Sequence, residues 1–330
     1  NRQHFLGHIT LLGLKEPVMP WCSDGASEAE IGGSLEITLS HWADACHAQG
    51  GTVVIPHLPN PNGEPAALIA TGRADAVEML RQEPYPHLEY YRYLNGGYRL
   101  PLVGGTDKMS SDVPVGIYRT YVRIPRDQPF SYEAWCRHMA AGRTFLSGGP
   151  ILRFTVDGCE IGDTLRLSGP GTVEAEAWAE SIMPIHTLQI VQEGRVVAST
   201  EEAKGARTLH VRAKLSVAKH TWLAARCGGP GYFDGPEHHD GWHRRRFAHT
   251  SPIYVAVGGD WWMWNDATAR YVLTLVDGSL QYIRARSTQY APGAAHHHHG
   301  EDDHQAFLER PFHEARAAIH RRMHQLGLAH

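Results

Sequence analysis

The stretch R-L-P-L-V-G-G-T-D-K-M, residues 99–109, decides the fold class of this chain. Its apolar run Leu100–Val103 is typical of a short buried strand, and two glycines then end the strand shortly before Asp107. A carboxylate at the mouth of a buried strand requires a partner, because burying an unpaired charge is costly. The expected partner of Asp107 is a metal ion, a basic side chain or a set of backbone N–H groups.

Two earlier stretches repeat this pattern of a strand followed by a polar residue. Thr52–Ile55 is a β-branched run that leads to His57, and Ala74–Val77 leads to Glu78. Helix-like segments precede these strands, at Ser34–Ala48, Glu64–Ala70 and His87–Leu94. Alternating strands and helices predict a parallel sheet or barrel, in which functional side chains lie beyond the carboxyl ends of the strands. His57, Glu78 and Asp107 therefore form one candidate site.

Beyond residue 150 the sequence changes from a helical to an alternating pattern. The change falls at Ser147–Pro150, and short strands separated by turn residues follow it. They are expected at Ile151–Val156, Thr172–Ala179, His186–Gln192, Thr208–Leu215, Thr221–Ala225 and Ile253–Val257. Short strands at about ten-residue spacing predict an Ig-like β-sandwich. Helices are then expected at Asp266–Arg284 and Phe312–Leu326.

The predicted fold is therefore α/β over residues 1–149, an all-β sandwich over 150–258 and a helical extension over 259–330. A chain of 330 residues is long enough to bury more than one hydrophobic core. Within the extension, the His-rich stretch His296–Asp303 is interpreted as a solvated linker, with metal buffering as the alternative.

Composition and charge narrow the class of protein. A net charge of −4 indicates neither a nucleic-acid partner nor binding to an anionic membrane, and no apolar run reaches the ~18 residues of a membrane span. The five cysteines are scattered and lack a C-x-x-C pair, which favours reduced thiols and a cytoplasmic location. The 23 histidines favour binding of a transition metal.

Each candidate residue also has an ordinary structural interpretation. His8 can be a satisfied core histidine, and His57, which lies between two prolines, can pack a loop. Glu78 can pair with Arg81, and Asp107 can cap a turn. Taken together at one edge of a parallel sheet, these residues favour a carboxylate–imidazole site for Zn, Mn or Fe. The sequence lacks a G-x-S-x-G elbow, a P-loop, an H-E-x-x-H motif and a G-x-G-x-x-G turn between a strand and a helix.

Four segments resemble successive motifs of the PHP superfamily of metallohydrolases. They are G-H-I-T-L-L-G-L (7–14), V-V-I-P-H-L-P (53–59), A-D-A-V-E (74–78) and L-V-G-G-T-D (102–107). The branch that they resemble is the carbaryl-hydrolase-like, CehA/McbA-type group. Later segments similar to that group lie at residues 141–152, 221–227 and 248–255, so the resemblance covers about residues 1–285.

This resemblance implies a distorted β/α barrel in which His8, His57 and Asp107 bind divalent metal ions, with Glu78 as a further candidate ligand. It implies an enzyme that hydrolyses an ester, amide, carbamate or phosphoester bond of a small-molecule substrate through a metal-activated water. His57 and Asp107 would orient the metal and the water. Arg99 or Lys108, near the end of the same strand, would stabilise an anionic intermediate.

Two features depart from the family pattern. The paired His-x-His and the acidic residue that open a PHP site would precede Asn1, and Met109 stands where many members carry a histidine. The chain is therefore expected to be the C-terminal piece of a longer enzyme, whose upstream part is truncated, disordered, or cleaved and still associated as a partner fragment of the same protein. The alternative is a non-catalytic binding or scaffold protein on a degenerate half-barrel. Assembly into a homo-oligomer is left open.

Overall fold

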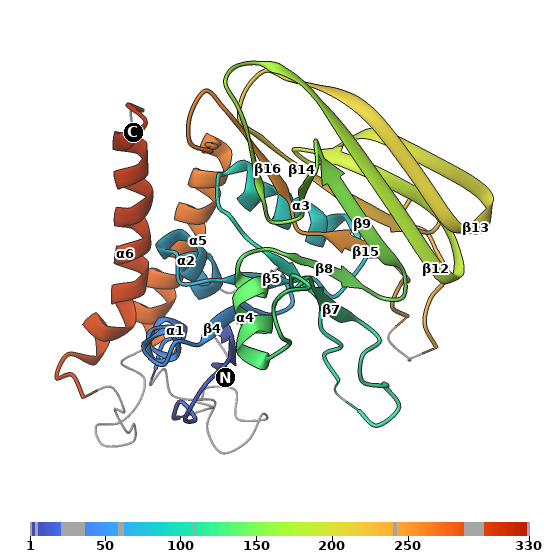
Figure 1. The fold of residues 1–330 in the computed structure, drawn as a ribbon. Coiled ribbons are helices and arrows are strands. Elements are labelled where there is room, and N and C mark those ends of the chain that lie inside the picture. Colours follow the sequence, from blue (N-terminus) through green and yellow to red (C-terminus); the bar gives the residue numbers. More distant parts are fainter. Residues whose placement is uncertain are drawn as a thin grey trace. The chain divides into compact units, whose positions relative to one another are not determined.

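The computed structural model describes residues 2–3, 6–20, 37–58, 63–108, 110–239, 243–286 and 300–328 (Figure 1). Its chain divides into two compact units. The helical unit comprises Asn1–Pro56, Asn60–Asp75 and Asn265–His330, and the β-rich unit comprises His57–Pro59 and Ala76–Trp264. The start of the helix expected from Ser34, the family position at Met109 and the run His296–His299 lie outside the described residues.

Within its described residues, the helical unit contains four short strands and four helices. The strands are β1 (Arg2–Gln3), β2 (Gly7–His8), β3 (Thr10–Leu12) and β4 (Thr52–Ile55), paired antiparallel as β1–β2 and β3–β4. The helices are α1 (Leu39–Ala48), α2 (Gly63–Thr71), α5 (Asp266–Arg286) and α6 (His304–Gln325). α5 confirms the helix predicted over Asp266–Arg284, and α6 begins eight residues before the predicted Phe312.

Helices α2, α5 and α6 pack against one another through apolar residues. On α5 the buried side chains Val272, Val276, Leu280 and Ile283 recur every three or four residues and so share one face. The approach of α2 to α5 is close, because a Cβ at Gly63 would lie 1.5 Å from the hydroxyl oxygen of Ser279. A larger residue at this position would therefore require Ser279 to move.

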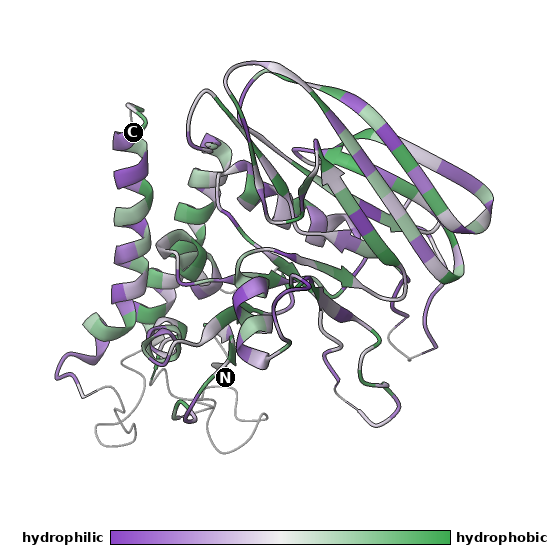
Figure 2. Ribbon diagram, viewed as in Figure 1, coloured by the Kyte–Doolittle hydropathy of each residue, from purple (hydrophilic) through white to green (hydrophobic). Residues whose placement is uncertain are grey.

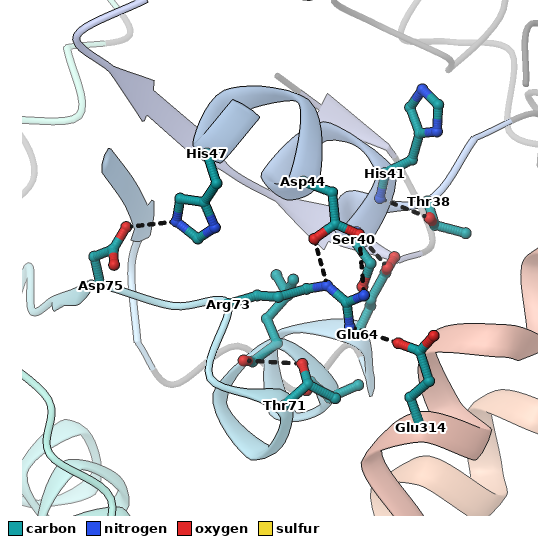
Figure 3. Close-up of polar contacts among 12 residues, drawn as sticks. Thr38, Ser40, His41, Asp44, His47, Glu64, Thr71, Arg73, Asp75 and Glu314 are labelled. Atoms are coloured by element: carbon teal, nitrogen blue, oxygen red, sulfur yellow. Dashed lines mark hydrogen bonds and ion pairs between the residues drawn. The ribbon is translucent and has the colours of Figure 1, made fainter. Parts of the chain in front are cut away.

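Charged side chains join the elements of this unit (Figure 3). Arg73 donates to both carboxylate oxygens of Asp44 on α1, at 2.7 and 3.0 Å, and to Glu314 on α6 at 2.7 Å. The carboxylate of Glu64 accepts the backbone N–H groups of Leu39 and Ser40, which caps α1 from α2. Burial raises the pKa of Glu64 to about 7.

The β-rich unit contains one large sheet, two further short strands and two helices (Figure 1). The further strands β5 (Ala76–Glu78) and β6 (Leu102–Val103) pair in parallel, and the helices are α3 (Pro84–Asn95) and α4 (Tyr132–Ala140). The large sheet contains β7 (Arg119–Val122), β8 (Thr144–Ser147), β9 (Ile151–Val156), β10 (Cys159–Glu160), β11 (Thr164–Leu167), β12 (Gly171–Gln192), β13 (Arg195–Val217), β14 (Thr221–Gly228), β15 (Ala248–Thr250) and β16 (Ile253–Val257).

These ten strands form one curled, largely antiparallel sheet, whereas a sandwich would require two sheets packed face to face. The segments Thr172–Ala179 and His186–Gln192 were predicted as separate strands but belong to the continuous strand β12. The register shifts between Glu180 and Ile185, as in a β-bulge, which bends a strand without ending it. The change of pattern at residues 149–150 falls between β8 and β9, two strands of this same sheet.

The N-terminal part of the chain is mixed α/β, as the alternating pattern predicts, although the parallel pairing that was expected throughout is wrong for β3 and β4. In the large sheet, apolar and polar residues alternate along β12 and β13 (Figure 2). The buried side chains Val173, Ala175, Ala177 and Ala179 point to the core, and their neighbours point away from it. None of the described helices combines the length and the apolar character needed to cross a membrane.

A buried polar cluster joins α3 to the large sheet. Tyr91 on α3 lies 2.7 Å from Nε2 of His249, whose Nδ1 lies 2.8 Å from the carbonyl oxygen of Thr250. In the tautomer that satisfies both contacts, Nδ1–H donates to the carbonyl and Nε2 accepts the Tyr91 hydroxyl. Arg226, beside His249 in the β14–β15 register, donates to the Tyr91 oxygen at 3.2 Å and to Gln189 at 2.8 Å.

Candidate active site

Glu78 lies at the carboxyl end of β5, level with the end of β6. The parallel register pairs Val77 with Leu102 and Glu78 with Val103. Beyond β6, the backbone of Gly105 lies directly against the Glu78 carboxyl group, because a Cβ at Gly105 would be 1.9 Å from Oε1. The glycine pair that the sequence shows after this strand therefore leaves room for the carboxyl group.

His57 lies beside Glu78 through two backbone contacts. Its N–H donates to Glu78 Oε2 at 2.9 Å, and the N–H of Leu58 donates to the carbonyl oxygen of Glu78 at 2.7 Å. These contacts fix the turn at residues 57–58 against the end of β5. Two of the three candidate residues that follow predicted strands are thereby placed side by side within the β-rich unit.

Asp107 lies on the loop after β6, and Arg244 holds the backbone of this loop. Arg244 is 7% exposed, and it donates to the carbonyl oxygen of Thr106 and, at 3.4 Å, to that of Asp107. The Thr106 hydroxyl donates to the carbonyl oxygen of Tyr118 at 3.1 Å. Arg244 was not found from the sequence because it lies 137 residues from Asp107, and the basic run at residues 244–246 was the only local signal.

His57 and Asp107 share an uncommon backbone conformation. Their φ angles are +38° and +47°, in the left-handed region that non-glycine residues rarely adopt. Such conformations persist where the surrounding structure fixes them, and they concentrate at functional sites. Two of the three residues that the resemblance implies as metal ligands are thus held in this conformation.

The charges of these groups affect one another. Burial, reinforced by the negative charge of Asp107, raises the pKa of Glu78 to about 7, against the opposing effects of the His57 N–H and the Arg244 guanidinium. Burial lowers the pKa of His57, and the charge of Asp107 opposes this effect. At neutral pH the Glu78 carboxyl group therefore exchanges between its protonated and ionised forms, which is the condition for a general acid or base.

The types of donor at this site fit a divalent metal ion, but the described donors do not complete a coordination sphere. His57, Glu78 and Asp107 offer one imidazole and two carboxylates, the mixture that Zn, Mn and Fe accept. Among the described residues, no group of three or more His, Cys, Asp or Glu side chains is arranged to hold a metal ion. His8 ends β2 in the helical unit. The four ligand assignments therefore stay predictions.

The two basic residues predicted from the sequence have other contacts. Arg99 precedes β6, where its guanidinium lies over the rings of Tyr254 and Trp261, at 4.4 and 5.0 Å from their centroids. Lys108 donates to the carbonyl oxygens of Ser110 and Val113 at 2.6 and 2.7 Å, which closes its own loop. Arg244 is the described basic residue that both donates to the Asp107 backbone and lowers the pKa of Glu78 by its charge.

Comparison with protein-family models and with curated proteins finds no match to this chain. The functional assignment accordingly depends on the geometry of the site and on the resemblance of the four segments.

Replacing Gly105 with Ala should move the Glu78 carboxyl group while leaving the fold intact. The added methyl group would occupy the position of Oε1, and Gly105 does not have the positive φ that would strain an alanine. We expect the pKa of Glu78, followed by carboxyl NMR, to shift away from 7. The control is Gly169→Ala, where the added methyl group meets open space. An unchanged Glu78 pKa in Gly105→Ala would contradict this geometry.

Proposed function

We propose that the chain is a metal-dependent hydrolase whose active site contains His57, Glu78, Asp107 and Arg244. The observation that carries this proposal is the environment of Glu78 at the ends of β5 and β6: its carboxyl group accepts the His57 N–H, and the charges of Asp107 and Arg244 act on it. The resemblance to PHP-type metallohydrolases supports it, since three of these residues lie in the segments that carry the resemblance. In this proposal, the N-terminal α/β part is a portion of a PHP-type distorted barrel.

In this proposal, the chain's own residues divide the work of binding and proton transfer. When bound, a divalent metal ion would supply a water of lowered pKa and would polarise the bond to be cleaved. His57 and Asp107 would hold the metal, and Glu78 would take up and return a proton at its carboxyl oxygens, because its pKa is close to neutral. Substrates are small molecules with an ester, amide, carbamate or phosphoester bond.

Arg244 acts in this account as a positioning residue. Its guanidinium donates to the carbonyl oxygens of Thr106 and Asp107, which flank the Asp107 Cα, and so fixes the direction of the Asp107 side chain. Burial strengthens these charge-assisted hydrogen bonds. The Arg244 charge also favours the ionised form of Glu78, which opposes the effect of Asp107.

The test is hydrolysis of an aryl ester, an aryl carbamate and an aryl phosphodiester by the chain supplied with Zn²⁺, Mn²⁺ or Fe²⁺. We expect metal-dependent turnover of at least one substrate and a loss of about 10²–10⁴-fold in Glu78→Gln, as for removal of a general base. The control is Glu133→Gln, in the exposed first turn of α4. Turnover that is absent with every metal, or equal in Glu78→Gln, would contradict the proposal and favour a non-catalytic binding protein.

A further inference from the structure

Two adjoining cavities open on the large sheet, and neither is lined by a residue of the candidate active site. Their volumes are about 330 and 470 Å³, and Ile151, Arg153 and Trp178 line both of them. The larger cavity is within the range of ~300–1,000 Å³ found for small-molecule sites. We call the two cavities together the Trp178 cleft.

The strand register arranges the residues of the Trp178 cleft in rows. Trp178 on β12 is paired with Arg153 on β9 and with His210 on β13, so these three side chains lie in one row across three strands. The next row contains Ile151, Glu180 and Thr208. The neighbours of Trp178 along β12, Ala177 and Ala179, are buried in the core, so the Trp178 side chain points to the opposite face of the sheet.

Flat aromatic surfaces form the apolar part of the cleft. Trp178 is 37% exposed although it is stacked on His210, with ring centroids 5.2 Å apart and an angle of 16° between the planes. A second stacked pair, Tyr121 and Phe145, lines the larger cavity, with centroids 4.7 Å apart and an angle of 6°. Two aromatic pairs thus line the cleft.

Two charged residues of opposite sign, Arg153 and Glu180, line the smaller cavity. Neither Arg153 nor Glu180 makes a side-chain hydrogen bond or an ion pair with any described residue. Two other acidic residues of β12 are paired with residues of β13, Glu176 with His210 and Glu174 with Arg212. A donor group and an acceptor group are therefore left available beside the exposed indole.

An exposed aromatic ring beside charged side chains of both signs limits the kinds of ligand that can bind in the Trp178 cleft. A purely apolar ligand would cover Arg153 and Glu180 without satisfying their polar atoms, which is unfavourable. The lining carries two basic and two acidic side chains, Arg123 and Arg153 against Glu160 and Glu180, so it favours neither an anion nor a cation. A neutral sugar ring satisfies both requirements, because its C–H face packs on an aromatic ring while its hydroxyl groups bind the guanidinium and the carboxylate.

We propose that the Trp178 cleft binds a neutral saccharide. One sugar ring would stack on Trp178, with hydroxyl groups bound by Arg153 and Glu180, and an adjoining ring would pack on the pair Tyr121–Phe145. The cleft contains no residue of the candidate active site, so the proposal is independent of the proposed hydrolase activity.

The test is titration of the complete chain with neutral tetrasaccharides of glucose (β-1,4 and α-1,4), xylose, mannose and N-acetylglucosamine. Binding is followed by tryptophan fluorescence and by saturation-transfer NMR. We expect at least one of them to bind, and Trp178→Ala to weaken that binding about tenfold or more. Arg153→Met, which keeps the apolar stem but removes the donors, should also weaken it.

The control for this test is Trp262→Ala, because Trp262 is 49% exposed but does not line either cavity. It should leave saccharide affinity unchanged, and all three variants should keep the melting temperature within a few degrees of the unmodified chain. Absence of binding by every tetrasaccharide, or binding that Trp178→Ala and Trp262→Ala affect equally, would overturn the proposal. Uronic-acid oligosaccharides are tested alongside, and binding of these charged sugars alone would also overturn the proposal.

Discussion

Lowering the pH from 7 to 5 should destabilise the unmodified chain relative to a His249→Gln variant by about 2 kcal/mol. Burial lowers the pKa of His249 from 6.5 to about 3, and the nearby Arg226 charge contributes to this shift. In the unfolded chain the imidazole titrates near pH 6.5. Between pH 6.5 and pH 3 the unfolded state therefore binds one more proton than the folded state, so stability falls as the pH falls.

Urea unfolding of both proteins at pH 7 and pH 5 measures this effect. The comparison isolates His249, because the other shifted groups are present in both proteins. Glu78 is one such group, and its raised pKa has the opposite effect of adding stability as the pH falls from 7 toward 4.5. The control is His243→Gln at an exposed position. A His249→Gln variant that loses as much stability on acidification as the unmodified chain would show that His249 is not buried in its neutral form.

Replacing Asp107 with Asn should lower metal affinity and hydrolysis together, by at least about tenfold, while the fold is retained. Even indirect contacts to a metal ion cost ~10–100-fold when they are removed. Asn has nearly the same shape, and like Asp it tolerates the left-handed conformation found at this position. The variant should also lower the pKa of Glu78, because the charge of Asp107 raises that pKa.

Zinc titration calorimetry, turnover and thermal unfolding of Asp107→Asn provide the three readouts. The matched control is Asp112→Asn, an exposed carboxylate of the same loop that pairs with Ser110. If Asp107 only caps a turn, Asn will serve nearly as well and stability will change by less than about 1 kcal/mol. Unchanged zinc affinity and turnover in Asp107→Asn would remove this residue from the site.

The candidate site could be predicted from the sequence where local pattern determines it. The β-branched run Thr52–Ile55 coincides with β4, and the glycines before Asp107 mark the end of β6. These local signals placed His57, Glu78 and Asp107 after strands. Arg244 could not be found in this way, because its position beside Thr106 and Asp107 results from the folding of a distant loop.

The arrangement of the strands was harder to predict for a similar reason. A sequence pattern shows where a strand forms, but the direction of its partner is decided by contacts between distant residues, as for the antiparallel pair β3–β4. In β12, the turn-like residues near Pro184 produce a shift of register rather than an end of the strand, because β13 continues to pair on both sides of it. One curled sheet results where two were expected.

The most direct test of the proposed site is pulsed electron paramagnetic resonance of the chain loaded with Mn²⁺. This measurement detects nitrogen atoms bound to the metal ion. The account predicts ¹⁴N modulation from an imidazole ligand in the unmodified chain, and a clear decrease of that modulation in His57→Gln. Bound Mn²⁺ without ¹⁴N modulation, or modulation of equal depth in both proteins, would contradict it.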